Sequence, residues 1–191
     1  MKKINFLLIV FALSICSCKN EKKVEKPIES EPVVEEVKVI TPKSITATLS
    51  AKSDSNVSGE VIFKEVNGSI EMSAVMSGLT PGVHAIHLHQ TADCSSADGK
   101  STGGHWNPTN EPHGKWGATD GYHKGDIGNF TADESGNGKI EFTTDQWCIG
   151  CDDETKNIIG KAVIVHAGED DLTSQPSGAA GARVSCAGVI E

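Results

Sequence analysis

Apolar and polar residues alternate in short runs from about residue 44 to the end of the chain. The segment 44–51, SITATLSA, separates Ile45, Ala47 and Leu49 by hydroxyl-bearing residues. A period of two residues is typical of a β-strand with one buried face, so this segment predicts a strand.

Further strands follow at short intervals. In residues 59–79, two apolar runs flank Asn67-Gly68, which is a strong signal for a β-hairpin. Other strand-like runs occupy 82–90, 125–147 with a glycine-rich turn at 136–138, 157–168 and 182–190. About eight short strands without a convincing helix predict an all-β domain, either a β-sandwich or a barrel.

Two segments interrupt this pattern. Residues 91–124 and 170–182 show little periodicity and are rich in small and polar residues. Loops of such length are unusual in a compact domain and usually serve a function. We therefore expect two long functional loops.

The chain begins with the features of a secretory signal. Residues 1–17 join the basic start MKK to an apolar run that is too short to span a membrane comfortably. Ser17 directly precedes Cys18, as in a bacterial lipoprotein cleavage box, so Cys18 is the expected lipidation site; Cys16 follows bulky Ile15 and is a weaker candidate. Lipidation would anchor the protein to a membrane outside the cytoplasm, in the periplasm or at the outer membrane. The alternative is ordinary secretion with cleavage nearby.

Residues 18–43 have the composition of a flexible tether. They are rich in Lys, Glu and Pro and contain no aromatic residue, so they cannot bury enough apolar surface to offset ordering. A short helix is the rival interpretation, but Pro27 and Pro32 argue against a long one. The folded domain is then expected at 44–191.

Charge narrows the range of partners. The 191 residues carry a formal net charge of −9, which argues against a nucleic-acid partner. An acidic surface mainly keeps a protein soluble.

The segment VHAIHLH holds three histidines on one expected strand. Alternate residues of a strand share a face, so His87 and His89 point the same way. His84 lies on the other face with Ile86 and Leu88. We therefore expect His84 to be a core histidine that donates to a backbone carbonyl rather than a metal ligand.

Outside this strand, four more histidines and an aspartate lie in the expected domain: His105 in GGHWNP, His113 in EPHGKW, His123 and Asp126 in GYHKGD, and His166 in AVIVH. Neutral imidazoles suit copper and zinc. Four imidazoles without a thiolate favour a redox-active copper, whereas three imidazoles and a carboxylate are typical of structural zinc. Six histidines and one aspartate fit two such sites if one histidine serves both metals.

These motifs resemble one known family. The stretches HAIHLHQ, GGHWNP, HKGDIGN, GKAVIVHAGEDDL and GARVSCAGVI lie between residues 45 and 190, and together they resemble the copper/zinc superoxide dismutase family. The resemblance implies an eight-stranded Greek-key sandwich or barrel. It also implies the conversion of superoxide to dioxygen and hydrogen peroxide by alternating reduction and oxidation of a bound copper, beside a structural zinc.

The resemblance assigns roles to individual residues. It implies copper ligands at His87, His89, His105 and His166, and zinc ligands at His105, His113, His123 and Asp126. His105 would thus bridge both metals and carry a proton during turnover. Asp170 would link ligands of the two metals through hydrogen bonds. Arg183, the only arginine of the chain, would attract the small anionic substrate, with an effect that weakens with salt.

The cysteines fit an oxidising compartment. The resemblance implies a disulfide between Cys94 and Cys186. Cys148 and Cys151, in WCIGC, have no such counterpart. A local disulfide is the favoured interpretation, with a redox-active pair and a further metal site as alternatives.

Two other functions remain open from the sequence. A non-catalytic metal store of the same fold would not need Arg183 together with all four copper-side histidines. A structural or adhesive surface domain would not explain the ligand set. The sequence leaves a monomer and a homodimer equally open.

Overall fold

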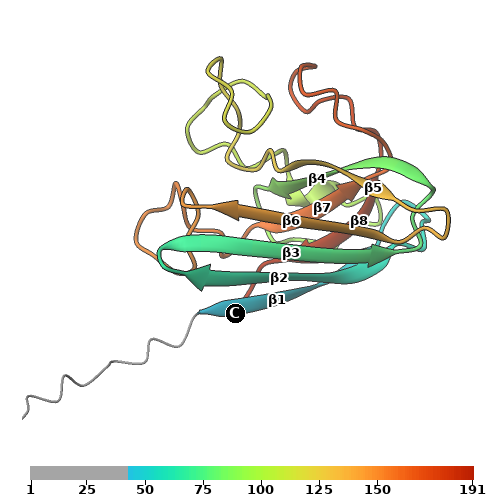
Figure 1. The fold of residues 1–191 in the computed structure, drawn as a ribbon, viewed down its shortest axis with the longest axis horizontal. Helices are drawn as coiled ribbons and strands as arrows, with labels where there is room; N and C mark the ends of the chain where they lie inside the picture. The colour runs from blue at the N-terminus through green and yellow to red at the C-terminus, as the bar shows by residue number, and fades with distance from the viewer. Residues whose placement is uncertain (1–42) are drawn as a thin grey trace, which may run out of the picture. The chain divides into compact units, whose positions relative to one another are not determined.

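Residues 43–191 form one closed β-barrel in the computed structural model, which describes this part of the chain (Figure 1). The strands are β1 (Ser44–Ala51), β2 (Ser58–Val66), β3 (Ser69–Ser77), β4 (Gly82–His89), β5 (Gly128–Ala132), β6 (Gly138–Thr144), β7 (Ala162–His166) and β8 (Arg183–Gly188). A single turn of 3₁₀-helix, η1 (Lys100–Thr102), lies between β4 and β5. Among these residues, no helix has the length and apolar character needed to cross a bilayer.

The strands follow the order β1-β2-β3-β6-β5-β4-β7-β8 around the barrel, and all neighbours are antiparallel. The chain therefore crosses from β3 to β4 and from β6 to β7 instead of pairing every strand with its successor, which is a Greek-key path. The expected all-β, eight-stranded Greek-key fold is confirmed.

The alternation of apolar and polar residues along the strands determines which side chains form the core of the barrel. Ile45, Ala47 and Leu49 of β1 are buried, while the intervening hydroxyl residues are exposed. The hairpin between β2 and β3 turns at Asn67 and Gly68, both with positive φ, as a two-residue turn of the twisted type requires.

Long connections leave the barrel at three places within the described residues. The loops after β4 and β7 rise from the same side of the barrel in Figure 1, coloured yellow-green and red. Both were expected from their lack of periodicity. The third, residues 145–161 between β6 and β7, was not anticipated as a long loop.

A β-bulge interrupts the pairing of β7 with β8. The register runs regularly from Ala162↔Gly188 to Val165↔Ser185 and then shifts, so that His166 lies opposite Arg183. Ala187 belongs to the barrel core, and strict alternation would put Arg183 on that same inner face. The bulge instead brings Arg183 beside His166, an example of a bulge that redirects a side chain next to a site.

The predictions for the N-terminus fall outside this part of the chain. The structure does not describe residues 1–42. This part of the chain contains the expected signal segment 1–17, the expected lipidation site Cys18 and all of the expected tether except Lys43.

Candidate metal centre

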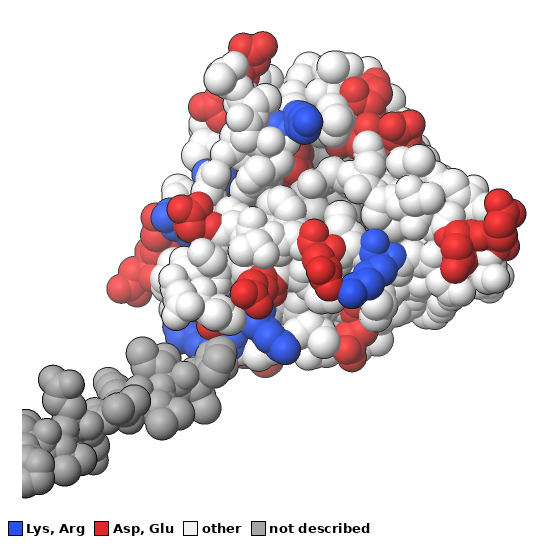
Figure 2. All heavy atoms as spheres, in the orientation of Figure 1, with Lys and Arg blue, Asp and Glu red and all other residues white. Residues whose placement is uncertain are grey.

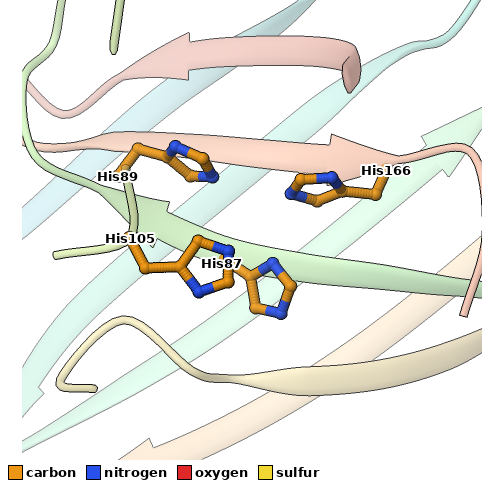
Figure 3. A group of neighbouring side chains, drawn as sticks. All are labelled: His87, His89, His105 and His166. Carbon is orange, nitrogen blue, oxygen red and sulfur yellow. The ribbon is translucent and has the colours of Figure 1, made fainter. Parts of the chain in front are cut away.

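Four of the candidate metal ligands lie on two strands and one loop. His87 and His89 lie on the outer face of β4, opposite to core residues Ile86 and Leu88, and His166 ends β7. The loop returns to β4 through a bridge between His89 and His105. Figure 3 shows the four imidazole rings gathered between these segments.

The expected ligands form two adjoining groups. In each group, one candidate ligand atom per residue lies within 4.8 Å of all the others. The four-histidine group consists of His87, His89, His105 and His166, and the mixed group consists of His105, His113, His123 and Asp126. All seven residues are buried, and His105 belongs to both groups. The structure therefore brings all seven expected ligands together.

Each histidine presents a nitrogen without a hydrogen-bond partner to its group. These buried atoms are His87 Nδ1, His89 Nε2, His105 Nε2 and His166 Nε2 in the four-histidine group, with His113 Nδ1 and His123 Nδ1 in the mixed group. The last two lie 3.0 and 3.2 Å from Asp126 oxygens but lack hydrogen-bond geometry. Unpaired buried nitrogens are costly unless a metal accepts their lone pairs, so the donor set fits two metal ions.

The opposite ring nitrogens are fixed by acceptors. His89 Nδ1 lies 3.0 Å from the carbonyl oxygen of Gly103, and His166 Nδ1 lies 3.4 Å from that of Gly181. A hydrogen bond at one nitrogen selects the tautomer and leaves the lone pair on the other. His105 differs, because its Nδ1 lies 2.8 Å from Asp126 Oδ1 within the mixed group. It thus presents one nitrogen to each group.

Asp170 connects the two groups. Its Oδ2 lies 2.8 Å from His87 Nε2, and its Oδ1 lies 2.9 Å from His113 Nε2. Burial alone would raise the pKa of Asp170, but the hydrogen bonds from His113 and His87 hold it well below the ordinary value. An ionised carboxylate therefore orients one ring of each group.

Burial favours the neutral form of three members of the four-histidine group. Desolvation lowers the pKa of His89 and of His166 well below the ordinary value, and it lowers the pKa of His105 to about 4. Neutral imidazole is the form that binds a metal.

The mixed group is electrostatically different. Burial would raise the pKa of Asp126, but the imidazoles of His105, His113 and His123 outweigh it and hold this pKa far below its usual range. For His113, burial acts to lower the pKa, but Asp126 and Asp170 raise it to about 9. The group thus concentrates negative charge where a cation would sit.

The loop after β7 holds the mixed group from outside. Gln175 accepts a hydrogen bond from the backbone N–H of His113 at 2.9 Å and donates one to its carbonyl at 2.8 Å. Gly178, with φ of +69°, lies so close to Asp170 that a Cβ there would collide with the carboxylate. The Gln175 hydrogen bonds tie this loop to the loop after β4, and the Gly178 contact packs the loop against its own Asp170.

An open cavity of about 590 Å³ exposes one edge of the four-histidine group. His89, His105 and His166 line it together with Arg183. Burial lowers the pKa of Arg183 from its very high ordinary value. The cavity thus places a half-buried guanidinium beside three of the histidines.

Residues 43–191 contain two disulfides, Cys94–Cys186 and Cys148–Cys151. The first ties the loop after β4 to β8, three residues beyond Arg183. The second closes a short ring in the loop 145–161. The local pairing favoured for WCIGC is therefore the one present.

His84 lies outside both groups, as strand parity indicates. Its Nδ1 is 2.8 Å from the carbonyl of His166, and its Nε2 is 2.8 Å from that of Thr80. It is buried and braces the backbone of a neighbouring group member rather than pointing at the site.

Several residues of the site carry no signal in a single sequence. Thr102 and Gln175 are common residue types whose importance depends on a partner more than sixty positions away. Gly178 matters only through its close approach to Asp170. Asp98 and Lys100, which line the cavity mouth, have the pattern of an ordinary charged turn.

The fold and the site together define a class: an eight-stranded Greek-key barrel with two adjoining clusters of metal-ligand type that share one histidine. The family model for copper/zinc superoxide dismutase (SODC) matches residues 57–190. The chain belongs to the copper/zinc superoxide dismutase family. Its enzyme class is accordingly superoxide dismutation, with copper and zinc as cofactors.

Individual proteins of known sequence or structure are also similar to this chain. An extracellular superoxide dismutase [Cu-Zn] of Brugia pahangi is 35% identical over 156 residues, which cover 75% of each chain. The solved structure of the clock protein EA4 has a TM-score of 0.67 at 32% identity and covers 79% of this chain and 97% of its own. A double mutant of a SOD-like protein from Bacillus subtilis has a TM-score of 0.69 at 28% identity, with 76% and 97% covered.

Proposed function

We propose that the four-histidine group binds the copper and that the mixed group binds the zinc. The observation that carries this assignment is the set of six unpaired buried nitrogens, four in one group and two beside Asp126 in the other. All-imidazole coordination suits a metal that changes oxidation state, and three imidazoles with a carboxylate suit a closed zinc site.

Copper, when bound, supplies the one-electron chemistry that oxidises one superoxide to dioxygen and reduces another to hydrogen peroxide. Arg183 attracts the anion into the cavity, where it meets the group that the cavity exposes. His105 carries a proton on Nε2 for the second half of the reaction, while Nδ1 stays in the mixed group.

The zinc has a structural role in this proposal. The mixed group is buried and lined by segments of the loop after β4, so a cation there would neutralise Asp126 and fasten the loop. Asp170 and Gln175 extend this support to the loop after β7.

Metal analysis with an activity assay tests the assignment. Protein purified without metal and then loaded should bind about one copper and one zinc per chain and consume superoxide. Zinc alone should leave the protein folded and inactive. Copper bound without turnover would instead favour a metal store, and no copper after loading would favour a structural domain.

We further propose that residues 1–17 are a signal peptide, that lipidated Cys18 anchors the enzyme to a membrane, and that residues 18–43 tether the domain outside the cytoplasm. The extracellular relative and the two disulfides support an extracytoplasmic location. Mass spectrometry of the mature N-terminus tests the anchor, because an unmodified terminus other than Cys18 would contradict it.

A further inference from the structure

We propose that Thr102 is a positioning residue for superoxide capture, because its buried hydroxyl fixes the guanidinium of Arg183. This inference rests on the proposed role of Arg183 as the residue that attracts the anion. Thr102 is fully buried at the end of η1, and Arg183 begins β8. The two residues are 81 positions apart.

The hydroxyl links two partners. Nη1 of Arg183 donates to Thr102 Oγ1 at 3.1 Å, and Oγ1 in turn donates to the carbonyl of Gly99 at 2.9 Å. The same Nη1 also donates to the Gly99 carbonyl at 2.9 Å. Arg183, Thr102 and Gly99 therefore form a closed triangle of hydrogen bonds.

The triangle orients the free edges of the guanidinium. Within the described residues, both hydrogen bonds of the Arg183 side chain start at Nη1. Nε and Nη2 thus remain for an anion in the cavity that Arg183 lines. An arginine side chain has many rotamers, so two acceptors on one nitrogen define its direction far better than one.

The chemistry of the partners preserves the positive charge. A carboxylate would pair with Arg183 and cancel much of its field at the cavity. A carbonyl and a hydroxyl are neutral, so they fix the group and leave its charge available.

The surroundings of Thr102 are rigid. Its carbonyl accepts a hydrogen bond from the backbone N–H of Thr91 at 3.1 Å. Cys94, earlier in the same loop, is joined to Cys186, three residues after Arg183. Gly99, in a left-handed conformation, packs so closely on the Arg183 stem that a Cβ would lie 3.3 Å from the Arg183 Cβ. The triangle is therefore built into two covalently connected segments.

A double-mutant cycle tests the proposal. Thr102→Val removes the hydroxyl and keeps the shape, so kcat/KM for superoxide should fall about fivefold to tenfold with copper and zinc contents unchanged. The affinity for azide, a small anion whose binding shifts the copper absorption band, should fall in parallel. Thr102→Ser should restore both quantities. In an Arg183→Ala background, Thr102→Val should cause no further loss, because the hydroxyl acts through Arg183.

Thr91→Val is the matched control. Its hydroxyl also donates to a carbonyl of this loop, that of Ser101, but the structure records no contact with Arg183. Unchanged kinetics in Thr102→Val, an equal loss in the Arg183→Ala background, or loss of metal in Thr102→Val would each overturn the proposal. If Arg183→Ala changes neither kcat/KM nor azide affinity, the result refutes the proposed role of Arg183 itself, and not only the role of Thr102.

Discussion

Asp170 shows how a single residue organises this site. Both of its carboxylate oxygens accept from imidazole nitrogens, those of His87 and His113, and so one side chain orients a ring in each group. The buried carboxylate therefore couples the two metal positions without belonging to either group.

Replacement of this carboxylate should weaken both sites. Asp170→Asn keeps the size but offers one amide N–H₂ where an acceptor is needed, so either His87 or His113 loses its partner. We expect metal affinity to fall about tenfold to a hundredfold, as measured by competition with a chelator.

The neighbouring residue provides the control for this change. Asp171 is exposed and accepts hydrogen bonds from Thr173 and Ser174 of its own loop. Asp171→Asn should leave metal affinity unchanged, and equal losses in both variants would show that loop charge, rather than ring orientation, controls binding.

At the residue scale, strand parity in the sequence alone separates His84 from His87 and His89, and their contacts agree with it. We could predict that His105, His113 and His123 converge only from residue type and family resemblance, because loop positions follow no hydrophobic period. Thr102 could not be singled out, since a buried hydroxyl is recognised only by its distant partner.

At the scale of elements, the strands were predictable and their irregularity was not. Alternation located β1 and the hairpin of β2 and β3, because each has one buried face. The bulge between β7 and β8 has no comparable signal, although it decides where Arg183 lies. Similarly, the strand-like runs expected at 125–147 and 157–168 extend into residues 145–161, which fold as a loop.

The two disulfides should differ in reactivity. Cys186 is fully buried, and Cys94 packs against an apolar cluster, whereas Cys148 and Cys151 are only partly buried. Ring closure contributes on the order of 4–5 kcal/mol for the long ring and roughly 2 kcal/mol for the short one. A limiting dithiol reductant should therefore open Cys148–Cys151 first, as followed by alkylation and mass spectrometry.

The short ring should also be dispensable for folding. The carbonyl and N–H of Cys148 are paired with Ile158 and Lys156, and the Asn157 side chain bonds Gly150 and Cys151. A Cys148→Ser/Cys151→Ser variant should keep its metals with a small decrease in Tm. In the unsubstituted protein, labelling of Cys94 and Cys186 before Cys148 and Cys151 would contradict the expected order of reduction.

At the scale of the whole molecule, an acidic protein must attract an anion. The chain has a formal net charge of −9, and acidic side chains are scattered with basic ones over the face shown in Figure 2. We therefore expect the attraction of superoxide to be local to the cavity, which Arg183, Lys100 and Asp98 line. The backbone N–H of Lys100 lowers the pKa of Asp98 to about 2, so this carboxylate is ionised at neutral pH.

Removal of this charge should accelerate capture. Asp98→Asn retains an acceptor for the Lys100 N–H and frees the ammonium that lies 3.0 Å away. We expect kcat/KM to rise roughly twofold to fivefold at low ionic strength and the difference to vanish at high salt.

Asp133→Asn is a control that separates the effect of charge at the cavity from the effect of the net charge of the protein. Asp133 is exposed in the turn between β5 and β6, and its carboxylate also accepts from a backbone N–H, that of Ser135, two positions on. The same change in net charge there should leave kcat/KM unaltered. An equal increase in both variants would assign the effect to net charge and not to the cavity mouth.

The most direct test of the paired metal centre is anomalous X-ray diffraction from crystals of the loaded, oxidised enzyme at the copper and zinc absorption edges. We predict a copper peak among His87, His89, His105 and His166, and a separate zinc peak among His105, His113, His123 and Asp126. His105 should bind copper through Nε2 and zinc through Nδ1. A single peak, or two peaks with no shared imidazole, would contradict it.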